Sequence, residues 1–391
     1  MEPDGGYGWF VVLCGFCVMQ DYLHRNVFNK SQSQLIQLSF VGTMIPVVAN
    51  AFSPFVQIAV SLFGFRAVML GGSMFIVIGL ELAGQSTKIW HLYLTQGLLF
   101  GIGISCLYTN VMAIAPHWFT KKRGVAMGIM GGGTAAGGLV VPFIMSSLNQ
   151  ALGPSWTYHI LGFICLAFTL YACVFVKEQR VSTKPGKKKL SEIVQLKVLK
   201  NKNYLFFIIA ANLGLFGNYI PYFYLPSFAT YYGLTESQGS SLIAAASASG
   251  FVGRIVAGVM ADKLGYFNSF IISNLIAGLS SLLVWSFAKS YGPLLCYAML
   301  FGFSSNTYYN IMPPIVTTLL PEDQFYSGLT LALLTNCIPI FGNNISSVIQ
   351  NSISTTPFFT HIMFTGVSYV FGAVLLFGVK LRLNKRPLAI V

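Results

Sequence analysis

Residues 177–203 read KEQRVSTKPGKKKLSEIVQLKVLKNKN, and they interrupt an otherwise strongly apolar chain of 391 residues. The segment contains nine basic and two acidic residues, so it carries +7 of the formal net charge of +13. Anionic lipid head groups attract such residues by about 1 kcal/mol each. We therefore predict a cytoplasmic linker at a membrane surface, with a short amphipathic piece near residues 190–199.

The composition of the whole chain indicates a protein that spans a membrane. Hydrophobic residues make up 55% of the chain and charged residues only 8%, whereas a soluble domain carries roughly 25% charged residues. The partners expected from this composition are membrane lipids, and no nucleic-acid-binding motif is present. Phosphate-binding loops and metal-ligand spacings are also missing from the sequence, so we expect no cofactor, no metal and no enzymatic activity.

Apolar stretches of about 20 residues, the length that crosses a bilayer as a helix, lie on both sides of the linker. With a short N-terminal run there are twelve, six on each side. The other eleven cover 35–62, 67–84, 92–115, 124–148, 157–176, 204–231, 238–260, 267–287, 293–319, 325–349 and 359–379. We predict an all-α polytopic membrane protein with an N-terminal six-helix half at 1–176, a linker at 177–203 and a C-terminal six-helix half with a basic tail at 204–391.

The distribution of basic residues predicts the orientation of these helices. If both termini are cytoplasmic, inner loops and the tail hold eighteen Lys and Arg residues and outer loops hold four. Cytoplasmic loops carry such an excess in membrane proteins. We therefore expect both termini to lie in the cytoplasm.

Three motifs stand at predicted helix ends: DGGYGW at 4–9, HWFTKKRGVAMG at 117–128 and GVMADKLG at 258–265. A fourth, PYFYLP at 221–226, lies within the predicted span 204–231. Together with the span count, they resemble the monocarboxylate transporter family, in its fungal-type branch, of the major facilitator superfamily. The resemblance implies a major facilitator fold, in which the substrate lies near the membrane midplane between the halves. It also implies gating or motif roles for Asp4, Gly6, Trp9, Lys121, Arg123 and Asp262. As the default of the family, it implies the plasma membrane as the location, with the vacuolar or another internal membrane as the alternative.

Arg254 is the remaining basic residue, and it lies inside a predicted span. A charge there costs at least about 2.5–3.5 kcal/mol on insertion scales. One interpretation is that its side chain extends to the inner interface, because it is about six residues, or roughly 9 Å, from the helix end. The other is a fixed cation whose guanidinium binds a carboxylate. The resemblance favours the second, since an arginine at this position binds substrate in that family.

Further polar residues in the C-terminal spans are candidates for contact with the substrate. Interhelical hydrogen bonds explain most such residues, and lining of a cavity explains the rest. The hypothesis of a substrate site includes, besides Arg254, the residues Asn218, Tyr222, Asn306 and Tyr309.

Proton coupling remains an open alternative. Carriers of the resembling family have an aspartate one helical turn before the arginine and a lysine near the outer end of the first helix. Here the first position is Gly250, and residues 1–29 contain no lysine. In place of that aspartate, Glu81 is an acidic residue inside the predicted span 67–84, so it is the candidate for proton coupling. The more ordinary interpretation is a carboxylate at the membrane interface that reaches water.

The first predicted helix is short. Its apolar run, Tyr7 to Met19, has 13 residues and a length of roughly 20 Å, whereas the hydrocarbon core is about 30 Å thick. Either the gene model or splice form lacks part of this helix, or the polar residues after Met19 enter the membrane or a cavity.

These features predict a secondary active transporter of a small organic anion, in the first instance a monocarboxylate, that works by alternating access. Two alternatives stay open. One is a carrier with the same fold for another metabolite, such as a vitamin. The other is a membrane paralogue that does not transport.

Overall fold

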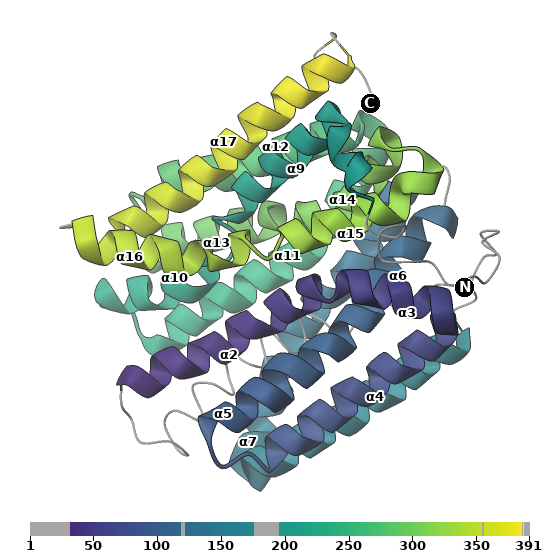
Figure 1. Ribbon diagram of the computed structural model, residues 1–391. Helices are drawn as coiled ribbons and strands as arrows, with labels where there is room; N and C mark the ends of the chain where they lie inside the picture. The colour runs from purple at the N-terminus through teal and green to yellow at the C-terminus, as the bar shows by residue number, and fades with distance from the viewer. Residues whose placement is uncertain (1–31, 119–121, 176–194, 354–355, 385, 387–391) are drawn as a thin grey trace. The chain divides into compact units, whose positions relative to one another are not determined.

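A computed structural model describes residues 32–118, 122–175, 195–353, 356–384 and 386, and the regular elements in those ranges are helices (Figure 1). Tertiary contacts divide the chain into two compact units. Unit 1 consists of Met1–Trp118 and Gly133–Gln195, and unit 2 consists of Phe119–Gly132 and Leu196–Val391. Each unit is described separately below.

Unit 1 contains the helices from α2 to most of α7. Their bounds are α2 (Gln32–Ala51), α3 (Ser53–Phe63), α4 (Phe65–Gly84), α5 (Ile89–Leu92), η1 (Tyr93–Leu99), α6 (Phe100–Trp118) and α7 (Arg123–Phe175). The residues Phe40–Ala51 of α2 and Ser53–Phe63 of α3 are inclined by 48°. Pro54 stands in the first turn of α3, where the missing N–H of proline leaves no helical hydrogen bond unmade. The predicted span at 35–62 is therefore one bent pair of helices.

The long helix α7 is two helices in succession. Its backbone leaves the helical region at Gly153, where φ is +81°, a conformation that glycine adopts without a Cβ clash. The stretches before and after Gly153 correspond to the separate spans predicted at 124–148 and 157–176. Residues 123–132 of α7 belong to unit 2, and the rest of the helix belongs to unit 1.

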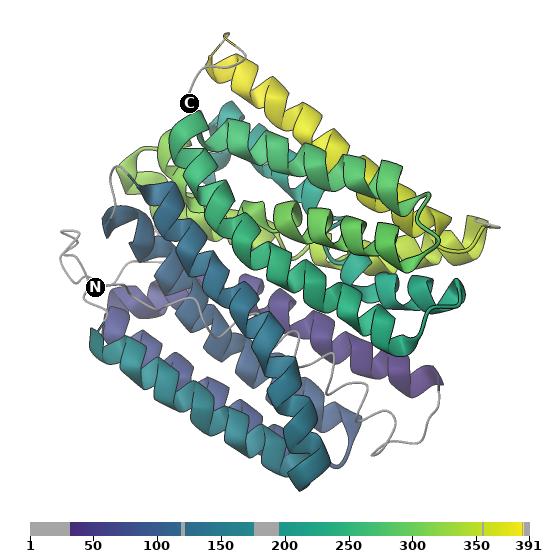
Figure 2. The same ribbon diagram turned by 180° about the vertical axis from the view of Figure 1, so that it is seen from behind.

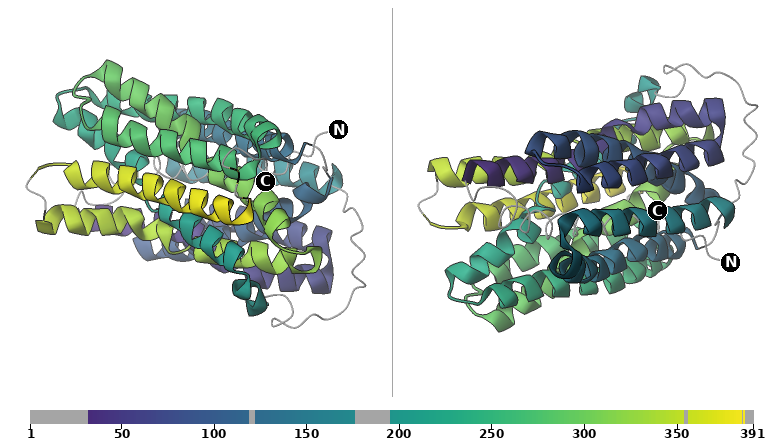
Figure 3. Two further views of the ribbon diagram at one scale, coloured as in Figure 1. Left: turned by 90° about the horizontal axis from the view of Figure 1, so that it is seen from above. Right: turned by 90° about the horizontal axis from the view of Figure 1, so that it is seen from below.

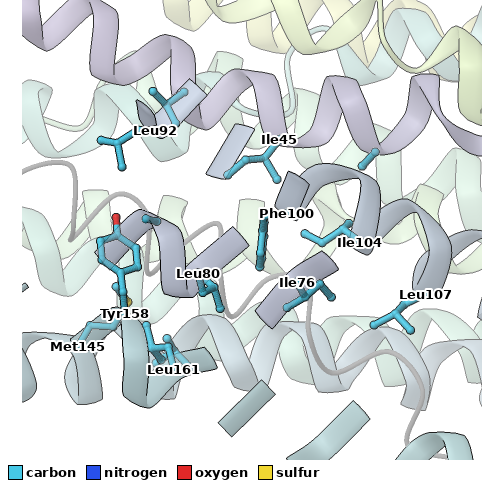
Figure 4. Packing of buried hydrophobic residues seen from close by; sticks show 14 of the residues in the cluster. Ile45, Ile76, Leu80, Leu92, Phe100, Ile104, Leu107, Met145, Tyr158 and Leu161 are labelled. Atoms are coloured by element: carbon cyan, nitrogen blue, oxygen red, sulfur yellow. The ribbon is translucent and has the colours of Figure 1, made fainter. Parts of the chain in front are cut away.

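The core of unit 1 lies between α2, α4, α6 and α7. Figure 4 shows buried side chains of these helices pointing toward one another, among them Ile76 and Leu80 with Phe100 and Ile104. The α4 and α6 backbones approach closely at Gly103. A Cβ added to this residue would lie only 2.6 Å from the carbonyl oxygen of Gly72. In lipid, helices associate through such close packing rather than through removal of apolar surface from water.

Unit 2 contains the remaining helices, which are displayed from behind in Figure 2 and from above and below in Figure 3. Their bounds are η2 (Leu196–Lys200), α9 (Lys202–Leu215), α10 (Ile220–Tyr231), α11 (Glu236–Leu264), α12 (Tyr266–Leu279), η3 (Ser280–Trp285), α13 (Tyr291–Ser305), α14 (Thr307–Leu319), η4 (Glu322–Gln324), α15 (Phe325–Thr335), η5 (Pro339–Phe341), α16 (Gly342–Ile353) and α17 (Phe359–Leu383).

Local signals in the sequence explain where several of these helices begin and end. Thr235 and Gln238 form a capping box that starts α11, and Gly265, with φ +93°, ends it. Asn201 caps α9 by accepting hydrogen bonds from the backbone N–H groups of residues 203 and 204, so the last residues of the basic segment already belong to helices. The α11 helix packs along α13, and α17 packs along α9 and α12 (Figure 1).

Three predicted spans of unit 2 are interrupted. Residues 216–219 separate α9 from α10, Asn306 separates α13 from α14, and the short η5 lies between α15 and α16. Such breaks free backbone groups within a span and are tolerated where they are buried in protein or line a cavity. Two of the three breaks, at residues 216–219 and at Asn306, contain residues of the predicted substrate site.

Among the described residues, eight helical stretches are long and apolar enough to cross a membrane, and the bent α2–α3 pair makes nine. Each of the eleven predicted spans other than the N-terminal run coincides with one helix or with consecutive helices separated by short breaks, and residue 176 lies outside the described ranges. The broken α13–α14 pair and the first part of α7 are helical without being among the nine.

Candidate functional site

Arg254 lies on α11 in unit 2, with only 4% of its surface exposed. Its guanidinium Nη1 donates a hydrogen bond of 2.6 Å to the backbone carbonyl of Gly131, which belongs to the first turns of α7 and to the same unit. The side chain therefore points toward α7 and is buried in protein. This placement disagrees with the interpretation in which the guanidinium extends to the membrane interface.

Glycines allow α7 to lie against α11 at this point. A Cβ on Gly128 would lie 2.5 Å from the carbonyl oxygen of Arg254, and one on Gly124 would lie 2.5 Å from that of Gly258. Because backbone atoms cannot move aside as a flexible side chain can, these positions require glycine. The glycine-rich start of α7 is thus a helix-packing surface.

Asp262 holds the N-terminus of α7. Its Oδ1 accepts a hydrogen bond from the backbone N–H of Gly124 at 2.7 Å, and its Oδ2 accepts one from Val125 at 2.8 Å. A carboxylate at a helix N-terminus is stabilised both by these free N–H groups and by the helix dipole. Arg123 lies beside this contact and donates to the Thr317 hydroxyl at 3.5 Å. The structure thereby brings together two of the predicted motif residues.

A network of neutral polar side chains occupies the breaks in the helices of unit 2. Asn306 donates through Nδ2 to the Tyr222 hydroxyl at 3.0 Å. The Tyr369 hydroxyl donates to Asn218 Oδ1 at 2.9 Å and approaches the backbone carbonyl of Ser305 at 3.1 Å. Ser305 joins the two parts, because its own hydroxyl lies 3.5 Å from that of Tyr222.

The fifth predicted substrate residue, Tyr309, forms a hydroxyl–hydroxyl contact of 3.1 Å with Tyr219. Asn218, Tyr222 and Asn306 thus belong to one hydrogen-bonded network of unit 2. Tyr309 contacts Tyr219, the neighbour of Asn218, and Arg254 lies on α11 of the same unit.

Sequence reasoning did not select Tyr369, Ser305 and Tyr219 as site residues. Tyr369 is a single tyrosine in an otherwise ordinary apolar helix, and no periodicity distinguishes it from a packing residue. Tyr219 adjoins the selected Asn218, so its position in a helix break was the available signal. No group of three or more His, Cys, Asp or Glu side chains in the described part of the chain is arranged to hold a metal ion.

In unit 1, Glu81 of α4 pairs with His159 of α7. The Glu81 Oε2 and the His159 Nδ1 are in direct contact, with side-chain exposures of 30% and 18%. The other imidazole nitrogen lies 3.5 Å from the Ser155 hydroxyl. Sequence reasoning selected Glu81, and only the fold shows that His159 is its partner.

Four of the predicted motif residues are not placed by the structure. Asp4, Gly6, Trp9 and Lys121 lie outside the described residues. Their roles therefore stay predictions.

The chain is similar to known proteins over nearly its whole length. The family profile described as Major Facilitator Superfamily matches residues 7–342. A protein named MFS transporter asaE from Aspergillus flavus is 27% identical, across 97% of this chain and 88% of the relative. A protein named Fujikurins efflux protein from Gibberella fujikuroi is 28% identical, across 99% and 85%.

Solved structures of low sequence identity share the arrangement of helices. The fucose:proton symporter FucP of E. coli superposes with a TM-score of 0.71 at 12% identity, and the human organic anion transporter MFSD10 with 0.71 at 15%. Both matches cover 95% of this chain and 98% of the other. These likenesses concern the fold alone, and they confirm the predicted all-helical architecture.

Proposed function

Because this chain belongs to the major facilitator superfamily and has its fold, we propose that it is a secondary transporter of a small organic anion, in the first instance a monocarboxylate. It is a multi-pass integral membrane protein, and membership of a transporter superfamily points away from an enzyme. The proposed location is the plasma membrane, and the proposed movement is alternating access.

The buried guanidinium of Arg254 is the observation that carries this proposal. A positive charge within a span is costly and by default marks a functional site. Its planar fork of N–H donors suits a carboxylate. Asn218, Tyr222, Asn306 and Tyr309 of the same unit offer neutral donors and acceptors that can orient the remainder of a small solute.

A carrier of another metabolite is the second candidate. The Gibberella fujikuroi relative is named as an efflux protein for fujikurins, and a similar role here means export of a small organic product. The amides and phenol hydroxyls of Asn218, Tyr222, Asn306 and Tyr309 support this alternative, because they can bind hydrogen-bonding groups of a neutral molecule as well as those of an anion.

The contact of Asp262 with the start of α7 supports a gating role. Moving the first turns of α7 away from α11 breaks both hydrogen bonds at Asp262 and the one between Arg254 and Gly131. We propose that this separation accompanies one of the two access states, so that Asp262 and Arg123 set the balance between those states.

Proton coupling, if present, cannot use an aspartate at position 250. A Cβ on Gly250 would lie 3.1 Å from the carbonyl oxygen of Gly302, so the close contact of α11 with α13 leaves little room for a larger side chain. We propose Glu81 as the proton-coupling residue, now with His159 as its partner. Direct contact of a carboxylate with an imidazole supports this, because both groups exchange protons.

The test is uptake of radiolabelled lactate by proteoliposomes that contain the purified full chain. We expect Arg254→Ala to abolish uptake and Arg254→Lys to retain a part of it. Arg382→Ala is the matched control, because Arg382 is an exposed arginine near the end of α17 that lies over the Phe206 ring. Lactate uptake that survives Arg254→Ala would refute the anion site.

Two further readouts separate the alternatives. Acidification of the vesicle lumen during uptake identifies proton symport, and its loss in Glu81→Gln identifies the coupling residue. A screen of labelled carboxylates, vitamins and neutral metabolites in the same vesicles separates an anion carrier from a carrier of another metabolite. If none of these solutes is transported, the paralogue that does not transport is favoured.

A further inference from the structure

Asn310 on α14 is a buried amide next to the site. Only 1% of its surface is exposed, and among the described residues its Nδ2 has no hydrogen-bond partner. Buried amide groups nearly always find a partner, and one left unpaired costs free energy. The Nδ2 group is therefore a donor that lacks an acceptor within the described protein.

Asn310 and Arg254 reach the same residue of α7 from two different helices. Arg254 donates to the Gly131 carbonyl at 2.6 Å. A Cβ on Gly131 would lie 1.9 Å from the Asn310 amide oxygen Oδ1 and 3.0 Å from its Nδ2, so the amide packs directly against the Gly131 backbone with its oxygen nearest. The helices α11 and α14 that carry the two side chains are themselves in contact.

Two side chains that carry donors of different kinds thus contact Gly131. The guanidinium has a positive charge and several N–H groups, and the amide has two N–H groups and no charge. Carboxylates have two oxygens with about four lone-pair sites, so they can accept from both donors at once. A backbone carbonyl has one oxygen and already accepts from Arg254.

We propose that Arg254 and Asn310 together bind the carboxylate of the transported anion, and that the Gly131 carbonyl is the internal acceptor which this carboxylate replaces. The inference rests on the proposed function and adds a second substrate-binding residue to it. It also connects binding with movement, because replacement of the Gly131 carbonyl removes one of the contacts that hold α7 to α11.

The test measures the KM of lactate uptake in proteoliposomes for Asn310→Leu, Asn310→Asp and Asn274→Leu. Asn274 on α12 is the matched control, because it is 2% exposed and its Nδ2 also lacks a partner among the described residues, but it adjoins Gly214 rather than Gly131. Lactamide, the neutral analogue of lactate, serves as the competing solute. Gel filtration and thermal melting check the folding of each variant.

We expect Asn310→Leu to raise the KM for lactate about tenfold, the loss of one charge-assisted hydrogen bond, and to leave inhibition by lactamide nearly unchanged. Asn274→Leu should change the KM less than about twofold, within the range of ordinary substitutions. Asn310→Asp preserves the shape of the side chain but places a carboxylate beside the guanidinium, so it should impair lactate uptake more than Asn310→Leu does.

The outcomes distinguish this inference from the proposed function. If wild-type uptake of lactate depends on Arg254 but Asn310→Leu behaves as Asn274→Leu does, the role of Asn310 is refuted and the anion site stands. The role is also refuted if Asn310→Asp transports lactate better than Asn310→Leu. That order is expected if the Asn310 amide only fills its place in the structure, because aspartate has nearly the same shape as asparagine. If the wild-type protein does not take up lactate, or does so without Arg254, the proposed function fails and this inference fails with it.

Discussion

The carboxylate of Asp262, near the end of α11, accepts a hydrogen bond of 2.7 Å from the backbone N–H of Gly124 at the start of α7. Its second oxygen accepts from the next residue, Val125. The last turn of one helix thus caps the first turn of another that is 138 residues earlier in the chain.

We predict that Asp262→Asn lowers the free energy of unfolding by about 2 kcal/mol, the value of a hydrogen bond to a charged group. The amide retains one acceptor oxygen but turns an NH₂ group toward a backbone N–H. Thermal melting of the purified protein measures the effect. Asp323→Asn is the control, because Asp323 is an exposed carboxylate in η4, and equal melting temperatures of the two variants would contradict the capping role.

Gly128 and Gly132 of α7 should respond differently to the same substitution. The added Cβ at Gly128 meets the Arg254 carbonyl oxygen at 2.5 Å, whereas at Gly132 the nearest atom is in the Phe251 ring at 3.5 Å. We expect Gly128→Ala to destabilise the protein by about 1–3 kcal/mol through overpacking. Gly132→Ala should be neutral or stabilising by up to about 1 kcal/mol, since alanine is the better helix former.

The comparison of these two variants is made by thermal melting and by limited proteolysis. One helical turn separates the two positions, so a general sensitivity of α7 would affect both. The close α7–α11 contact is disproved if Gly128→Ala melts at or above the temperature of Gly132→Ala.

The pair of Glu81 and His159 should show energetic coupling. In a double-mutant cycle with Glu81→Gln and His159→Gln, we expect a coupling free energy in the lower part of the usual range of about 0.5–3 kcal/mol. The lower part is expected because both side chains are partly exposed, at 30% and 18%, and solvent screens their interaction. Strictly additive effects on thermal stability would show that the pair is not energetically significant.

At position 358, replacement by glycine should destabilise the protein less than replacement by alanine. It precedes α17 with φ +61°, a left-handed conformation that is strained for a residue with a Cβ. Its ring packs against Phe228 and Tyr231, with centroids 5.4 Å and 5.8 Å away. Both Phe358→Gly and Phe358→Ala should lose this packing and melt below the wild type.

The informative quantity is the difference between the two variants. Glycine releases the backbone strain, so Phe358→Gly should exceed Phe358→Ala in stability by about 1 kcal/mol. At a position inside a helix, alanine is instead more stabilising than glycine. An alanine variant that melts higher than the glycine variant would show that the backbone is not strained at this position.

Much of the fold could be predicted because membrane spans are a local property of sequence. The length and apolarity of a segment set its cost of insertion, and this cost does not depend on distant residues. The eleven predicted ranges outside the N-terminal run therefore coincide with helices. The break at Asn306 and the bend between α2 and α3 were less predictable, because they depend on which neighbouring groups satisfy the freed backbone.

The candidate site was predicted in composition but not in contacts. Arg254 could be selected because an ionisable residue in a span is rare and costly, and Asn218, Tyr222, Asn306 and Tyr309 because they are polar in apolar surroundings. Tyr369 and Asn310 could not be assigned roles, since hydrogen-bonding and packing residues of these types look alike in sequence.

From the sequence alone follow the membrane class, the helical spans and the basic segment between the halves, because apolarity and charge act residue by residue on transfer into lipid. The tertiary structure alone decides that Arg254 meets Gly131, that Asp262 caps α7 and that Glu81 pairs with His159. Those contacts join residues 78 to 138 positions apart. Which distant side chains meet depends on how closely the helices pack, and the glycines of α7 set that distance.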